Sequence, residues 1–213
     1  MRSVDALLLD CHGIVLNDPF RLFLTDCARR RGVDERDFLE QWDRDLRESA
    51  WLRTIDDAML WQALRPEHFE AGCWERELEP LYELGPAAPR LPAWKQRVPI
   101  WLLSNHRGAW LRPRLARFDL ASSFEGLLIS DEIGALKPSS EAFDIAHRTI
   151  GARRVLFVDN SQRNIDAANR AGMSSIFVGP QNDWISEVDR ALCANHEPPV
   201  GSNGTIDRLN RSA

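Results

Sequence analysis

The chain has 213 residues and a formal net charge of −5, with 44% hydrophobic and 28% charged residues. This composition is typical of a globular protein with one main core, and the acidic balance excludes a broad basic surface for nucleic acid. The longest apolar stretches, such as residues 98–103, are far shorter than a membrane span, and the first ten residues lack the layout of a signal peptide. We therefore expect a cytoplasmic protein that binds neither nucleic acid nor membranes.

The first predicted element is a buried strand at residues 4–9, which Asp10 and Gly13 follow. An unbroken apolar run of this length is typical of a strand buried on both faces of a parallel sheet. Gly13 stands where the chain must turn sharply. Asp10 is therefore predicted at the carboxyl edge of the sheet, where open parallel sheets bind ligands.

Residues 17–91 show helical periodicity without a convincing strand, which predicts an inserted cap of four helices. The four helices are predicted to begin at Pro19, after Asp34, at Thr54 and at Pro66, because each of these residues suits a helix start. Tryptophan is concentrated here, and its side chains are expected to build the core of the bundle; these residues are Trp42, Trp51, Trp61 and Trp74. A proline-rich segment from Gly85 is expected to form the hinge back to the sheet.

From residue 98 onward, strand and helix patterns alternate. Strands are predicted at residues 98–103, 126–129, 155–158 and 174–178, with helices at 108–118, 140–150 and 164–171. Such alternation predicts right-handed βαβ units and a doubly wound, Rossmann-like parallel sheet of the α/β class. The predicted organisation is a core at 1–16 and 92–195, the cap at 17–91, and a poorly ordered tail at 196–213 that is rich in Pro, Gly, Ser and Asn.

Polar residues follow the later strands as Asp10 follows the first. Ser104 and Asn105 end the second strand and suit the binding of an anionic oxygen. Lys137 precedes a proline that opens a helix, so its ammonium is expected at the positive end of that helix. Asp159 ends the fourth strand, and two strand-end carboxylates could share a hard cation such as Mg²⁺.

This order of motifs, with a helical insert after the first strand, resembles the haloacid dehalogenase (HAD) superfamily, in the subfamily with a helical-bundle cap. The resemblance covers about residues 4–180. It implies a Mg²⁺-dependent phosphatase or phosphoryl transferase that acts on a small phosphorylated metabolite through an aspartyl-phosphate on Asp10. Ser104 and Lys137 would hold and neutralise the transferring group. Asp159 would bind Mg²⁺ together with Asp10 and the backbone carbonyl of His12.

Asn105 and Arg21 are also predicted to contact the substrate, whereas His106 is not. Asn105 would bind an anionic oxygen, and Arg21, just past the nucleophile loop, would contact a substrate anion from the cap. His106 follows Asn105 directly, and we assign it only a loop or helix-start role.

The sequence departs from the resemblance at His12. HAD phosphatases usually carry Asp-x-Asp, and the second Asp serves as the general acid and base. Three hypotheses follow. In the first, His12 serves as the general acid and base, since imidazole titrates near neutral pH. In the second, the acid–base function is lost and the protein has a binding or regulatory role. In the third, the protein is a metal-independent 2-haloacid dehalogenase, because a halide leaves without a proton. Dehalogenases of this kind tend to carry Ser-Ser-Asn in the segment where this chain has Asp159. The carboxylate of Asp159 therefore favours a metal-dependent enzyme over the dehalogenase.

Overall fold

The computed structural model describes residues 4–65 and 77–193 and contains a five-stranded sheet whose strands are all parallel. The strands are β1 (Ala6–Leu9), β2 (Ile100–Ser104), β3 (Gly126–Ile129), β4 (Val155–Asp159) and β5 (Ser174–Phe177). Their order is β3-β2-β1-β4-β5. The predicted α/β class and doubly wound sheet are therefore confirmed. Within the described ranges, no helix is both long and apolar enough to cross a membrane.

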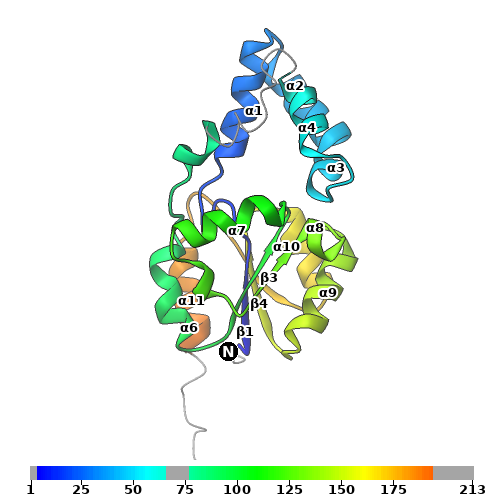
Figure 1. The fold of residues 1–213 in the computed structure, drawn as a ribbon. Coiled ribbons are helices and arrows are strands. Elements are labelled where there is room, and N and C mark those ends of the chain that lie inside the picture. Colours follow the sequence, from blue (N-terminus) through cyan, green and yellow to red (C-terminus); the bar gives the residue numbers. More distant parts are fainter. Residues whose placement is uncertain (1–3, 66–76, 194–213) are drawn as a thin grey trace, which may run out of the picture.

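Helices cover both faces of this sheet, as Figure 1 shows with the sheet seen nearly edge-on. One layer contains α6 (Leu91–Lys95), α7 (Gly108–Arg117) and α11 (Trp184–Cys193), and the other contains α8 (Ser130–Ile133), α9 (Ser140–Ile150) and α10 (Gln162–Arg170). Short turns at η4 (Ala88–Arg90) and η5 (Ala121–Ser123) complete this part. Side chains of β1 alternate between the layers, with Leu7 and Leu9 in one core cluster and Leu8 in the other.

Pro138, which the sequence predicted to open a helix, lies in the turn before α9, and the side chain of Ser139 caps that helix instead. Three further differences concern this core. β5 is not buried on both faces: it lies at the edge of the sheet, and Phe177 is 37% exposed. The proline-rich segment is not a hinge throughout, because it is helical from Ala88 and Trp94 is buried. The third difference is α11, which was not predicted although the apolar residues Trp184, Val188 and Leu192 recur every four positions.

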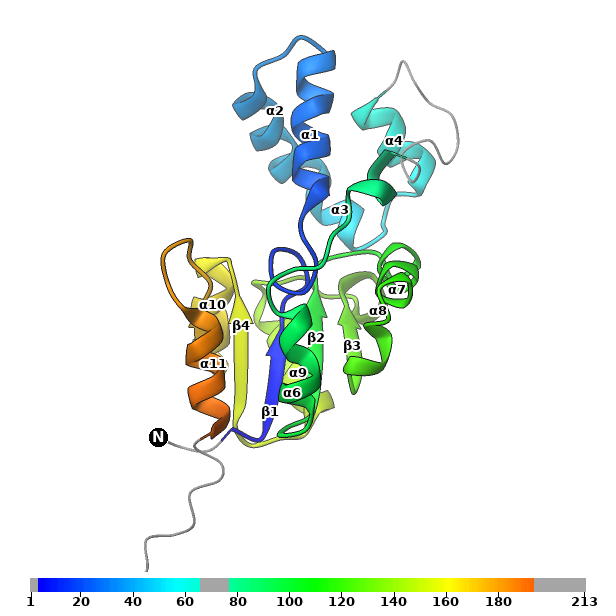
Figure 2. The same cartoon turned by 90° about the vertical axis from the view of Figure 1, so that its left-hand side faces the viewer.

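The cap stands above the carboxyl edge of the sheet (Figures 1 and 2). It contains α1 (Pro19–Arg30), α2 (Glu35–Gln41), a π-helical turn η1 (Trp42–Leu46), α3 (Arg47–Trp51), α4 (Asp57–Leu64) and η3 (Glu79–Leu81). The predicted starts at Pro19 and after Asp34 are confirmed. The start at Thr54 is wrong, because the carboxylate of Asp56 accepts from Met59 N at 2.7 Å and caps α4 instead. The start at Pro66, like Trp74 and the predicted tail, lies outside the described residues.

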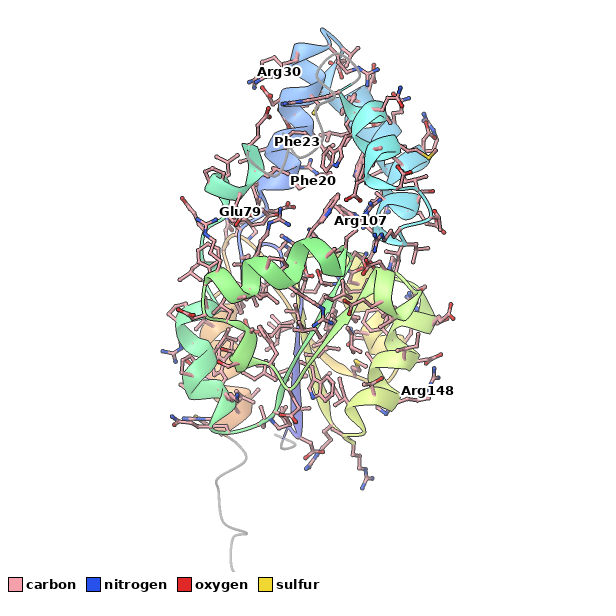
Figure 3. The ribbon with its side chains drawn as sticks, viewed as in Figure 1. Phe20, Phe23, Arg30, Glu79, Arg107 and Arg148 are labelled. Carbon is pink, nitrogen blue, oxygen red and sulfur yellow. The ribbon has the colours of Figure 1, made fainter. Side chains whose placement is uncertain are left out.

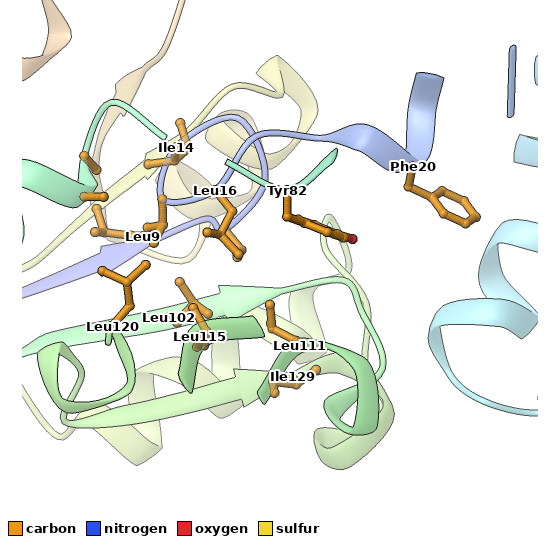
Figure 4. Close-up of a cluster of buried hydrophobic side chains, with 14 of the residues drawn as sticks. Leu9, Ile14, Leu16, Phe20, Tyr82, Leu102, Leu111, Leu115, Leu120 and Ile129 are labelled. Atoms are coloured by element: carbon orange, nitrogen blue, oxygen red, sulfur yellow. The ribbon is translucent and has the colours of Figure 1, made fainter. Parts of the chain in front are cut away.

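Aromatic side chains of the cap form one cluster that reaches into the core. Phe20, Trp42 and Trp51 contact one another with ring centroids 5.1–5.8 Å apart. Trp110 of α7 joins them by stacking on Trp61 at 5.4 Å. In Figure 4, Tyr82 lies on the side of the core cluster that faces Phe20. The cap and the sheet layer containing α7 therefore share a continuous apolar core.

Arg107, the residue before α7, attaches the corner between α3 and α4 to the core. Its side chain is 1% exposed. Nε donates to the carbonyl of Ala50 at 2.8 Å, Nη2 donates to that of Ile55 at 2.9 Å, and Nη1 bonds the carboxylate of Asp57. Figure 3 places Arg107 between α7 and this corner, and Glu79 near the other end of α7, where Arg114 and Arg117 bind it. The cap is thus fastened to α7 at both ends.

Candidate active site

Asp10 lies directly after β1, and its carboxylate is 13% exposed. Lys137 Nζ donates to Asp10 Oδ1 at 2.7 Å. Burial raises the pKa of Asp10 to about 6, opposed by the positive charge of Lys137 and supported by the negative charge of Asp159. The predicted nucleophile is therefore largely buried and in contact with the ammonium of Lys137.

Lys137 joins two carboxylates. Its ammonium is 2% exposed and donates to Asp159 Oδ2 at 2.8 Å as well as to Asp10. Burial alone would lower the pKa of Lys137, but Asp10 and Asp159 raise it above the ordinary value, so the ammonium stays charged. Lys137 and Lys95 are the only lysines among the 27 lysines and arginines of the chain.

Asn105 holds the backbone of Lys137. Its Oδ1 accepts from Lys137 N at 2.8 Å, and its Nδ2 donates to the Lys137 carbonyl at 2.8 Å. Both ends of the amide are therefore engaged by the chain itself. The sequence predicted a substrate contact for Asn105, whereas its hydrogen bonds in the structure position Lys137.

Asp159 ends β4 and is fully buried. Oδ1 accepts from Ser161 N at 2.7 Å, and Oδ2 accepts from Asn164 Nδ2 at 2.9 Å in addition to Lys137. Each oxygen of this carboxylate is therefore already hydrogen-bonded, which makes Asp159 an anchor for the ammonium.

Ser104 ends β2 and is 1% exposed, yet its hydroxyl has no hydrogen-bond partner among the described residues. It lines a cavity of about 620 Å³ together with Asp10 and Lys137. A buried hydroxyl without a partner calls for an explanation, and a ligand or water in the cavity supplies one. On the cap side the same cavity is lined by Phe20, Arg21, Trp42, Arg47 and Trp51. The structure thus brings six predicted residues around one cavity: Asp10, His12, Arg21, Ser104, Asn105 and Lys137.

The imidazole of His12 packs face to face on that of His106, with centroids 4.8 Å apart and planes inclined by 19°. Its Nε2 is buried and has no partner within the described part of the chain. Burial lowers the pKa of His12 to about 4, although Asp18 opposes the shift. His12 is therefore a neutral imidazole near neutral pH, which argues against its serving as the general acid but leaves a ring nitrogen able to accept a proton.

His106 has a larger role than the loop position that the sequence suggested. It is 2% exposed and stacks on Trp51 of the cap, with centroids 5.0 Å apart and planes inclined by 18°. Its backbone N–H donates to Ser130 Oγ at 3.0 Å. Nothing in the local sequence signals this position, because its stacking partners, His12 and Trp51, come from two distant segments.

The predicted Mg²⁺ ligands fit only in part. A cation between Asp10 and Asp159 would take the place of the Lys137 ammonium, which already contacts both. The carbonyl of His12, in contrast, lies beside the side chain of Asn160, whose Nδ2 is 3.1 Å away. Rotating this amide exchanges its nitrogen and oxygen. Asp10, the His12 carbonyl and the Asn160 amide oxygen then form an all-oxygen set of the kind that Mg²⁺ prefers.

Gly13 makes this arrangement possible. Its φ is +81°, and a Cβ there would lie 2.4 Å from Asn160 Nδ2. Any other residue would be strained in this left-handed conformation and would displace the amide from the His12 carbonyl. The sharp turn predicted at Gly13 is confirmed.

No family model and no curated protein matches the chain. Solved structures do. A HAD family enzyme from Bacteroides thetaiotaomicron has a TM-score of 0.72 at 17% identity, covering 88% of this chain and 99% of that one. The same protein in complex with magnesium and inorganic phosphate gives 0.69 at 18%, covering 87% and 99%. L-2-haloacid dehalogenase from Xanthobacter autotrophicus gives 0.60 at 19%, covering 92% and 85%. At such low identities these comparisons establish a shared fold.

Proposed function

We propose that this chain, which has the fold of HAD family enzymes, is a hydrolase in which Asp10 attacks a small phosphomonoester. The observation that carries the proposal is the buried Lys137 ammonium, 2.7 Å from Asp10 Oδ1, at a cavity that the unpartnered hydroxyl of Ser104 also lines. A carboxylate can approach a phosphate dianion only where positive charge offsets their repulsion. The phosphate complex of the Bacteroides neighbour adds support.

The reaction would proceed in two displacements. A carboxylate oxygen of Asp10 bonds to phosphorus while the bond to the leaving alkoxide breaks, and water supplies the proton to that alkoxide. Water then attacks the aspartyl-phosphate, releases inorganic phosphate and regenerates Asp10. Lys137 neutralises the charge near Asp10, and the hydroxyl of Ser104 donates to a phosphoryl oxygen.

Magnesium would be held by Asp10, the carbonyl of His12 and the amide oxygen of Asn160, in place of the set with Asp159 that the sequence predicted. When bound, it supplies positive charge that offsets the repulsion between the carboxylate and the phosphate. Asp159 would still contribute to the site by holding the ammonium of Lys137 in place. The neutral amide of Asn160 contributes less attraction than a carboxylate, so we expect weak binding of the ion.

A substrate panel tests the proposal. Sugar phosphates, nucleotides and p-nitrophenyl phosphate are incubated with the protein, with Mg²⁺ or with EDTA, and phosphate is measured. We expect release that requires Mg²⁺ and falls more than about 10³-fold in Asp10→Asn, because the nucleophile is lost. Asp144→Asn, an exposed carboxylate on α9, is the matched control and should behave as wild type. Release that persists with EDTA, or that is unchanged in Asp10→Asn, would contradict the proposal.

A metal-independent 2-haloacid dehalogenase is the second candidate, and one observation favours it. Position 12 holds a buried imidazole, and the carboxylate of Asp159 is bound to Lys137, so neither of these two positions offers a free carboxylic acid to protonate a leaving group. A halide leaves without a proton. Chloride release from 2-chloropropionate in EDTA, abolished by Asp10→Asn, would establish this reaction. A folded protein silent in both assays would instead indicate the binding or regulatory role.

The ionisation of Asp10 gives a pH prediction. Because burial raises its pKa to about 6, lowering the pH through 6 protonates the nucleophile and removes its reactivity. We expect a carboxyl ¹³C signal that titrates near pH 6 in the metal-free protein and is absent in Asp10→Asn. With Mg²⁺ bound to Asp10 the positive charge of the ion lowers this pKa, so the rate should fall about tenfold per pH unit only below a midpoint that lies under that of the metal-free protein. A signal that titrates near pH 4, the ordinary range of Asp, would show that the carboxyl is not desolvated.

A further inference from the structure

Three rings form a continuous stack from the cap to the loop that carries Asp10. Trp51 ends α3 of the cap, His106 follows β2, and His12 lies two residues after Asp10. The centroids are 5.0 Å apart between Trp51 and His106 and 4.8 Å apart between His106 and His12, and the planes incline by 18° and 19°. Side chains of three distant segments thus align nearly parallel beside the cavity.

The outer end of the stack is fixed to the core. Ser130 Oγ donates to the carbonyl of Trp51 at 2.6 Å and accepts from the backbone N–H of His106 at 3.0 Å. One hydroxyl therefore holds two members of the stack. Arg107 adds its bond to the carbonyl of Ala50, one residue before Trp51. The position of α3 consequently determines where the ring of His106 can lie.

The inner end is part of the turn that presents Asp10. The carbonyl of His12 accepts from Asn160 Nδ2 at 3.1 Å, and Gly13 N donates to Leu16 O at 2.6 Å. Tyr82, on the chain that returns from the cap, lies 6.2 Å from the His12 ring. Because hydrogen bonds hold the turn on both sides of His12, the ring of His12 projects from a fixed segment of backbone that also carries Asp10.

We infer that Trp51, His106 and His12 are positioning residues: the stack transmits the seating of the cap to the Asp10 loop, and His12 contributes the flat face of its ring. The inference has two parts. That the stack positions Asp10 for catalysis rests on the proposed function. That the stack holds the cap in place rests only on the contacts between the rings. A carboxylate at position 12 offers no aromatic face to His106, so it would break the stack that an aromatic ring preserves.

The test compares His106→Phe with His106→Ala, since only the former retains a ring. Hydrogen exchange at residues 47–57 reports cap docking, exchange in β1 and β4 reports that the sheet is folded, and kcat and KM report positioning. We expect His106→Ala to exchange at least tenfold faster at 47–57 with an unchanged sheet, and to lose at least tenfold in kcat. His106→Phe should stay within threefold of wild type in both. The control His147→Ala removes an exposed histidine of α9.

At position 12, His12→Phe should keep the slow exchange at 47–57, and His12→Asp should lose it. The inference is overturned if His106→Ala matches wild type in exchange, or if His106→Phe is as impaired as His106→Ala, since ring nitrogens would then matter rather than ring faces. If docking responds as expected but kcat does not, the coupling to Asp10 is refuted. If wild type releases no phosphate, the proposed function fails, and exchange alone still decides on docking.

Discussion

Replacing Lys137 with methionine should slow hydrolysis by about 10²- to 10³-fold, the usual cost of losing one preorganised charge-stabilising donor. Methionine keeps most of the volume of the side chain but removes the ammonium that contacts Asp10 and Asp159 at 2.7 and 2.8 Å. The two carboxylates then repel each other and the substrate. Steady-state kinetics with the best substrate of the panel measures the loss.

The same change should destabilise the fold by about 3–5 kcal/mol at neutral pH, because Asp159 is fully buried and loses its cation. In this variant Asp10 loses the positive charge that lowers its pKa, so its pKa rises further above the unfolded value, protonation favours the folded state, and the deficit shrinks as the pH falls. Urea unfolding near pH 7 and near pH 5 measures both effects in the metal-free protein. Lys95→Met, at an exposed lysine, is the control. A deficit that does not change with pH would argue against the uncompensated carboxylates as its cause.

Replacing Arg107 with alanine should lower the free energy of unfolding by about 3 kcal/mol, near the lower end for a broken buried ion pair. The buried guanidinium bonds the carbonyls of Ala50 and Ile55 and the carboxylate of Asp57. The Asp57 side chain is 47% exposed and can return to water, which limits the cost. The corner of the cap should then exchange its amide hydrogens faster than the sheet does.

Arg112→Ala is the control for Arg107. Arg112 lies on α7, the helix that Arg107 precedes, and pairs with Glu132, but its side chain is 52% exposed, so we expect a loss below about 1 kcal/mol. Equal losses in the two variants would show that the cap does not depend on Arg107. Arg107→Lys should recover little, because one ammonium cannot reproduce the forked contacts to three acceptors.

The sequence was sufficient to place three candidate site residues at one edge of the sheet, because their positions follow from topology. Asp10, Ser104 and Asp159 each end an apolar run, and parallel strands bring their carboxyl ends to one edge. What the sequence could not predict is the direction of hydrogen bonds. Asn105 faces the backbone of Lys137, and Asp159 faces the ammonium, because side-chain torsions and neighbours decide this. Residue order does not encode those choices directly.

In the cap, too, the sequence pattern predicted where helices lie but not which side chains contact one another. Periodicity identified the starts of α1 and α2, but Thr54 and Asp56 are both good capping residues, and only local geometry selected Asp56. The burial of Trp110 could be expected from its place on α7. That it stacks on Trp61 of the cap could not, because a buried face does not specify which side chain will cover it.

Because the chain has only two lysines, chemical labelling of their amines can report whether the cavity is open. Apart from the amino terminus, an amine-reactive reagent can modify only Lys95, which is exposed, and Lys137, which is buried beneath the cavity. A mass spectrum that counts labels therefore separates molecules whose site has opened from molecules whose site is closed. The rate at which the second lysine label appears would time the opening of the cavity without a mutation or a fluorophore.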